Sequence, residues 1–72
     1  MKKKFTKDQK KLFKALHKQL KEVKALYWMK VDELENIAKT NTGLEIEFFH
    51  VDGECVGVGT VDREYKLFQW ID

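Results

Sequence analysis

The sequence contains a single cysteine, Cys55, and no hydrophobic run that approaches the length of a membrane-spanning helix. One cysteine cannot form a disulfide within the chain, which is typical of proteins from a reducing compartment, so we predict a cytoplasmic protein. The lysine-rich N-terminus is not followed by an apolar stretch, and we therefore expect neither a signal peptide nor membrane association. The length of 72 residues predicts one small domain over residues 1–72, near the lower limit for a self-sufficient core.

Arginine is nearly absent as well, because Arg63 is the only one in the chain and the other basic residues are lysines. The planar guanidinium group contacts guanine or phosphate through two parallel hydrogen bonds, and an ammonium group cannot reproduce this geometry. Any nucleic-acid binding by this chain should therefore have little sequence preference and a steep dependence on salt.

The net charge of +2 conceals a strong asymmetry along the chain. Residues 1–30 carry eleven lysines and two acidic residues, a net charge of +9, whereas residues 31–72 carry three basic and ten acidic residues, a net charge of −7. Two interpretations are open: the halves neutralise one another within the fold, or each half faces a different partner.

A basic amphipathic helix is predicted to begin at Thr6. Residues Thr6 to Gln9 match the capping-box pattern, in which the Thr6 hydroxyl and the Gln9 side chain each bond the other residue's backbone amide. Apolar residues then recur at helical spacing on one side, and lysines occupy the opposite side. The apolar set is Leu12, Phe13, Leu16, Leu20, Val23, Leu26 and Tyr27.

Neither glycine nor proline marks the end of this helix between Ala25 and Thr42. One continuous helix to Lys39 would be about 50 Å long, too long for a compact domain of this size unless it forms a coiled coil. Trp28 and Met29 would also point into the lysine side of such a helix. We therefore predict a break, a short second helix from Asp32 to Lys39, and a helical part that covers residues 6–39.

The remaining residues, 44–71, predict a three-stranded antiparallel meander. Asp52-Gly53 between two apolar runs is typical of a type I′ hairpin turn, which would pair Val51 with Glu54 and Phe49 with Val56. Residues 65–71 provide the third strand. The fold class is thus α+β in the order α-α-β-β-β, with one long and one short helix packed on one face of the sheet.

This register places two glycines, Gly57 and Gly59, on the sheet face that packs against the helices. The expected reason is close approach to aromatic residues of the third strand, since a glycine leaves room that a side chain would fill. A one-residue change in the register would exchange the two faces.

A catalytic or metal site is not expected. His50 would lie opposite Cys55, but a nucleophilic cysteine also needs an orienting group and an oxyanion hole, and the sequence offers neither. One cysteine and two distant histidines do not have metal-ligand spacing. We predict that the protein is not an enzyme and has no cofactor, metal or small-molecule substrate.

The lysines of the first helix are the principal candidate binding residues for a polyanion or an acidic partner. They repel one another at i,i+3 and i,i+4, and a bound polyanion would relieve this repulsion and release counterions. The alternative is that they form a hydrated helix surface. The candidate residues are Lys7, Lys10, Lys11, Lys14, Lys18 and Lys21.

A second candidate surface lies on the sheet, where acidic residues surround an apolar centre, as in many protein interfaces. It comprises Glu45, Glu47, Phe49 and Val58. The leading hypothesis is a small non-enzymatic accessory or inhibitory protein, of the kind that phages and other mobile elements encode, which binds a protein partner through its charged surfaces or forms a homodimer. The alternative is non-specific nucleic-acid binding through the lysines of the first helix.

Overall fold

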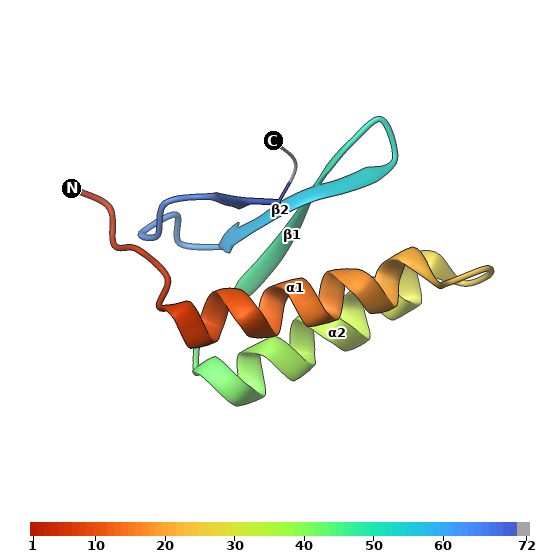
Figure 1. The fold of residues 1–72 in the computed structure, drawn as a ribbon, viewed down its shortest axis with the longest axis horizontal. Helices are drawn as coiled ribbons and strands as arrows, with labels where there is room; N and C mark the ends of the chain where they lie inside the picture. Colours follow the sequence, from red (N-terminus) through yellow and green to blue (C-terminus); the bar gives the residue numbers. More distant parts are fainter. Residues whose placement is uncertain (71–72) are drawn as a thin grey trace.

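The computed structural model describes residues 1–70, in which two helices cover one face of a three-stranded antiparallel sheet (Figure 1). The order along the chain is α1 (Lys7–Lys21), α2 (Tyr27–Thr42), β1 (Ile46–Val51), β2 (Glu54–Thr60) and β3 (Phe68–Gln69), and the sheet order is β1-β2-β3. The predicted α+β class and element order are confirmed; residue 71 of the predicted meander lies outside the described residues. Within residues 1–70, neither helix is long and apolar enough to cross a bilayer.

Helix α1 begins as the sequence predicts. The Gln9 backbone amide donates to the Thr6 hydroxyl at 3.1 Å, and the Thr6 backbone amide donates to the Gln9 side chain at 2.9 Å. These two bonds complete the capping box and satisfy amides that the first helical turn leaves without partners. The apolar side of α1 then buries Phe13, Leu16 and Leu20 in the core.

The predicted break between the helices is confirmed, but the predicted short second helix from Asp32 to Lys39 is wrong, because α2 has 16 residues and ends at Thr42. Helix α1 ends at Lys21, and α2 begins at Tyr27, after Leu26 turns the chain in the left-handed region with φ 55°. No side chain caps this start. The rings of Tyr27 and Trp28 contact His50 instead, so tertiary packing supports a helical turn that local signals did not indicate. Helix α2 ends before Gly43, which also has a positive φ of 74°.

The Asp52-Gly53 hairpin turn is confirmed, whereas the register predicted beyond it is wrong. Val51 faces Glu54 and His50 faces Cys55, but Phe49 then faces Gly57, where the prediction placed Val56. A β-bulge between Phe49 and His50 causes this shift, because β2 contains one residue more than β1 over the same length.

The bulge exchanges the two faces of β2. Val58 is 0 % exposed and Thr60 is 3 % exposed, so these residues, rather than Gly57 and Gly59, face the core. Gly57 has a different role. A Cβ atom added there would lie 2.6 Å from the backbone oxygen of Phe68, so glycine at this position allows β3 to lie against β2.

Strand β3 is shorter than predicted, since it covers Phe68–Gln69, and the residues that precede it contact the N-terminal segment. Tyr65 forms a parallel bridge with Lys3, and the Lys66 amide donates to the Lys3 carbonyl oxygen at 2.7 Å. Phe5 anchors this segment: its ring lies edge-on to Phe13 at 4.9 Å and stacks on Tyr65 at 4.8 Å. The first residues are therefore integral to the fold.

Candidate functional site

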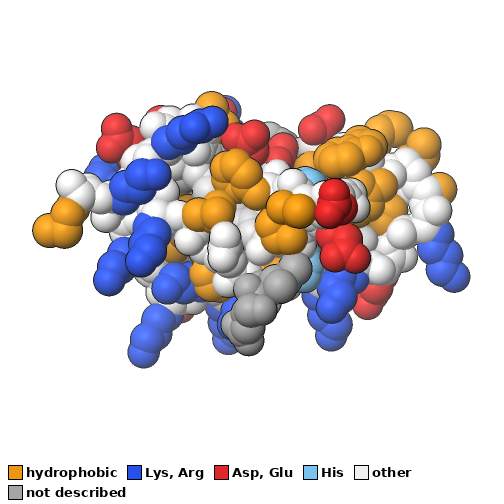
Figure 2. Space-filling view, turned by 90° about the horizontal axis from the view of Figure 1, so that it is seen from above, with side chains coloured by type: hydrophobic (Ala, Val, Ile, Leu, Met, Phe, Trp, Pro, Cys, Tyr) orange, Lys and Arg blue, Asp and Glu red, His pale blue; other side chains and the backbone are white. Residues whose placement is uncertain are grey.

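The six candidate lysines of α1 form one continuous side of the molecule, which we call the lysine face (Lys7, Lys10, Lys11, Lys14, Lys18 and Lys21). Lys10 is half-buried and the others are exposed. Among residues 1–70, the ion pairs join Lys30 to Glu33 and Lys39 to Glu45, and neither involves α1. Direct pairing with the acidic half therefore does not neutralise this face, and Figure 2 shows basic side chains gathered along one side and toward one end of the molecule.

Part of the lysine face lies against the edge of β3. Lys10, Lys14, His17 and Lys21 recur at i, i+4, i+7 and i+11, so they form one stripe along α1. The Lys10 and Lys14 ammonium groups lie 5.4 and 5.9 Å from the Phe68 ring centroid, within the range of a cation–π contact. Further along, the His17 ring stacks on Trp70 at 4.3 Å. We call the surface between this stripe and the rings of Phe68 and Trp70 the α1–β3 groove.

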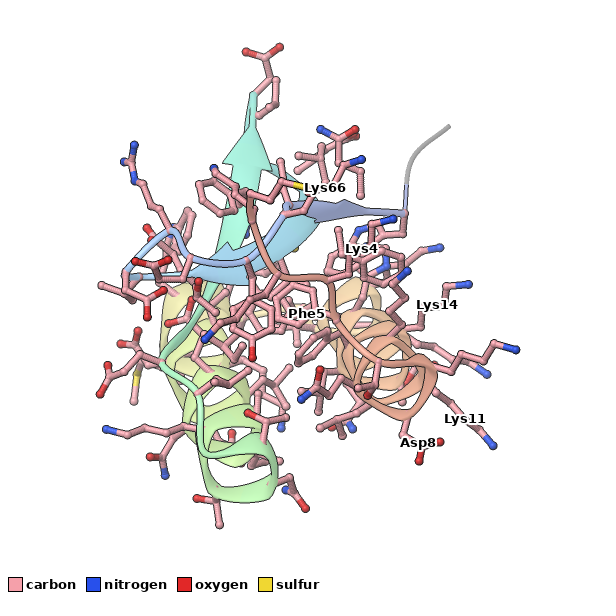
Figure 3. All side chains as sticks on the ribbon, turned by 90° about the vertical axis from the view of Figure 1, so that its left-hand side faces the viewer. Lys4, Phe5, Asp8, Lys11, Lys14 and Lys66 are labelled. Atoms are coloured by element: carbon pink, nitrogen blue, oxygen red, sulfur yellow. The ribbon has the colours of Figure 1, made fainter. Side chains whose placement is uncertain are left out.

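Two further lysines extend the basic surface at the N-terminal end of the groove. The bridge between Lys3 and Tyr65 brings Lys4 to the same side of the molecule as Lys66 and Lys14, whereas Asp8 points away from them (Figure 3). A hollow of about 210 Å³ is lined by Lys4, Phe5, Lys10, Lys66, Leu67 and Phe68. An adjoining hollow of about 450 Å³ is lined by Lys7, Lys10, Lys11, Lys14 and Phe68. Ammonium groups thus surround an aromatic ring on a concave surface.

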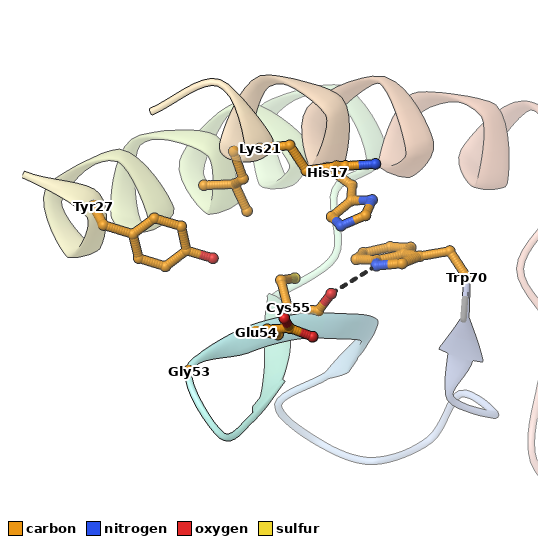
Figure 4. A pocket seen from close by; sticks show the side chains of 8 residues that line it. His17, Lys21, Tyr27, Gly53, Glu54, Cys55 and Trp70 are labelled. Atoms are coloured by element: carbon orange, nitrogen blue, oxygen red, sulfur yellow. Dashed lines mark hydrogen bonds between the residues drawn. The ribbon is translucent and has the colours of Figure 1, made fainter. Parts of the chain in front are cut away.

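A pocket of about 400 Å³ lies at the opposite end of the groove, between α1 and the hairpin (Figure 4). We call it the α1–hairpin pocket; it is lined by His17, Leu20, Lys21, Tyr27, Gly53, Glu54, Cys55 and Trp70. Its aromatic walls are held in place: the Trp70 indole N–H donates to the Cys55 carbonyl oxygen at 2.9 Å. The Tyr27 hydroxyl lies 2.8 Å from His50 Nε2.

Burial lowers the pKa of His17 below its usual value of 6.5, and the nearby Lys21 ammonium acts in the same direction. The Cys55 carbonyl opposes this shift but has the smaller effect. His17 is therefore mainly neutral at pH 7, and the His17–Trp70 pair presents an uncharged aromatic surface between the cationic groups of Lys14 and Lys21.

The predicted sheet surface is only partly exposed. Val58 is buried in the core, so its prediction as a binding residue is wrong, and the bulge that exchanges the faces of β2 is the physical reason. Phe49 is half-buried beside Gly59, Glu45 is paired with Lys39 at 2.7 Å, and Glu47 is exposed. The structure does not bring these four residues together as an acidic rim around an apolar centre.

The pairing of His50 with Cys55 agrees with the sequence, but the surroundings of the thiol favour a structural role. Cys55 is 6 % exposed, and burial raises the pKa of its thiol to about 11. The thiolate is the nucleophilic form, so little of it is present at neutral pH. Among residues 1–70, no group of three histidine, cysteine or acidic side chains could hold a metal ion.

Sequence reasoning missed several residues of the groove: Lys4, His17, Lys66, Phe68 and Trp70. The position of His17 in one stripe with Lys10, Lys14 and Lys21 was a usable signal, because helical spacing alone places them together. Lys66, Phe68 and Trp70 had no comparable signal, since their position depends on the path of the chain after Thr60.

Comparisons of the chain with protein-family models, with curated proteins and with solved structures give no match. Only the geometry of the groove and the pocket therefore indicates a function.

Proposed function

We propose that this protein is a small, non-enzymatic binding protein that holds the phosphate backbone of a nucleic acid on its lysine face and α1–β3 groove. The observation that carries the proposal is the convergence of Lys4, Lys10, Lys14 and Lys66 around Phe68, on a concave surface. Phosphates spaced along a strand suit such a row of cations, and their binding would relieve the mutual repulsion of the lysines.

The lysine-rich composition supports binding without sequence preference. An ammonium group contacts phosphate as a point charge and lacks the fork of donors with which arginine identifies guanine. We further propose a cytoplasmic setting, where the single thiol of Cys55 would stay reduced, and an accessory or inhibitory role such as phages encode.

Fluorescence anisotropy with a labelled mixed-sequence DNA tests the proposal. We expect binding at about 50 mM salt that weakens by about 1000-fold at 200 mM, because releasing the counterions of some six phosphates gives this dependence. Equal affinity for two unrelated sequences is also expected. Absence of binding to both DNA and RNA at 50 mM salt would refute the proposal.

A second candidate function is binding of a second copy of this chain through the end of the molecule near the hairpin tip. The exposed fractions of Leu26, Trp28, Met29 and Val51 lie between 57 % and 71 %, and Trp28 contacts His50 beside Val51. The same apolar patch on two copies can cover itself across a two-fold axis. Light scattering should then give twice the mass of 8.6 kDa, and the mass of a Trp28→Ser variant should fall to that of one chain. A monomeric wild type at about 0.5 mM would exclude this function.

A further inference from the structure

We propose that the α1–hairpin pocket binds one unpaired nucleobase of a single-stranded nucleic acid whose backbone follows the lysine face. This inference rests on the proposed nucleic-acid binding and adds to it a ligand class, single strands, and a second kind of contact, base stacking.

The size and walls of the pocket suit a planar, uncharged ring. Its volume of about 400 Å³ is in the range of small-molecule sites, and three aromatic side chains, His17, Tyr27 and Trp70, line it. Stacking on aromatic side chains is how proteins hold unpaired bases without sequence preference. The pocket therefore offers a stacking surface at the end of a row of cations.

The stacking surface is already ordered in the free protein. The indole N–H of Trp70 bonds the Cys55 carbonyl oxygen, and the Trp70 ring also contacts Phe48 at 6.1 Å and Phe68 at 6.0 Å between centroids. The His17 ring lies nearly parallel to it, with an interplanar angle of 23°. A base that stacks on this assembly would immobilise few additional side chains, so most of the stacking energy would appear as affinity.

The charges around the pocket separate the base from its phosphates. Glu54 lines the pocket and would repel a phosphate there, whereas its carboxylate can accept a hydrogen bond from a base N–H group. Lys21 lines the pocket and also belongs to the lysine face, and Lys14 is seven residues, or about 10 Å, along the same helix. In this arrangement the phosphates of the nucleic acid would bind along α1, and the base would bind toward the hairpin.

The test compares two labelled oligonucleotides of 12 nucleotides: one with bases, and one in which every base is absent but the phosphate backbone is retained. Fluorescence anisotropy at about 50 mM salt and pH 7.5 should show that the base-bearing strand binds about 5- to 100-fold more tightly. This is the gain in affinity that one base stacked on aromatic side chains provides. The His17→Ala variant should reduce this ratio to about one, whereas a Gln19→Ala control on an exposed part of the same helix should retain it.

A direct readout comes from Trp28→Phe, which leaves Trp70 as the only tryptophan. Trp28 is not among the residues that line the pocket, so its replacement leaves the pocket walls in place, and the remaining tryptophan emission comes from Trp70 in the pocket wall. We expect the base-bearing strand to quench Trp70 emission and the abasic strand to leave it unchanged.

The outcomes separate the two proposals. Equal affinity for both strands, with no quenching of Trp70, would overturn the base pocket and leave backbone binding in place. No affinity for either strand would overturn both. Tighter binding of polyglutamate than of either strand would also overturn both, and would indicate an acidic protein partner.

Discussion

The double substitution Lys10→Glu with Lys14→Glu is expected to reduce nucleic-acid affinity by at least about 100-fold at 50 mM salt. The two ammonium groups flank Phe68 in the middle of the basic surface, so the change removes two phosphate contacts and introduces two repulsive charges. Each lost contact should also reduce the slope of log affinity against log salt by about one. Anisotropy titrations at several salt concentrations measure both quantities.

A matched control carries the same change of net charge, from +2 to −2, away from the groove. Lys24→Glu with Lys39→Glu alters the interhelical segment and one exposed ion pair, which contributes little to stability. We expect this control to lose less than about 10-fold in affinity, because only the long-range field changes. Equal losses in the two double variants would mean that net charge, rather than the groove, determines binding. Circular dichroism should show that both remain folded.

The Gly57→Ala variant should lose stability and nucleic-acid binding together. The added Cβ would lie 2.6 Å from the Phe68 carbonyl oxygen, and backbone atoms cannot rotate away as the end of a side chain can. Either β3 separates from β2, or the sheet distorts at a cost of about 2–3 kcal/mol. In a domain of this size, that cost corresponds to a fall in Tm of about 10–20 °C. Phe68 and Trp70 would also leave the groove, which would remove one of its walls. Thermal unfolding followed by circular dichroism, and the oligonucleotide titration, measure the two effects.

The Gly59→Ala variant is the control. Its Cβ would lie 2.8 Å from Cε2 of Phe49, a half-buried side chain that can rotate toward solvent. We expect a stability loss below about 1 kcal/mol and unchanged DNA affinity, partly because alanine restricts the unfolded chain more than glycine does. If Gly57→Ala were as stable as Gly59→Ala, the proposed role of Gly57 in positioning β3 would be wrong.

The elements that the sequence predicted correctly depend on short-range signals. The capping box at Thr6 and the Asp52-Gly53 turn involve residues at most three positions apart, and both form as expected. The elements that were predicted wrongly depend on distant contacts. Helix α2 begins at Tyr27 because its first residues pack on His50, more than twenty positions away. Tyr65, predicted to lie in the third strand, pairs instead with Lys3, more than sixty positions away, and β3 is confined to Phe68–Gln69.

The sequence by itself determined the α+β class and the order of the elements. It also determined the amphipathic nature of α1 and the grouping of six lysines on one side of that helix. Helical and strand periodicity place these residues without reference to the rest of the chain. Only the tertiary structure decided what the lysines face. The bulge between Phe49 and His50 put Val58 in the core and removed it from the predicted binding surface. The N-terminal bridge brought Lys4 to Lys66, and β3 laid Phe68 and Trp70 against the Lys10–Lys21 stripe. A single extra residue in β2 and a contact across more than sixty residues have no periodic signature, so the groove and its pocket become visible only when the chain is folded.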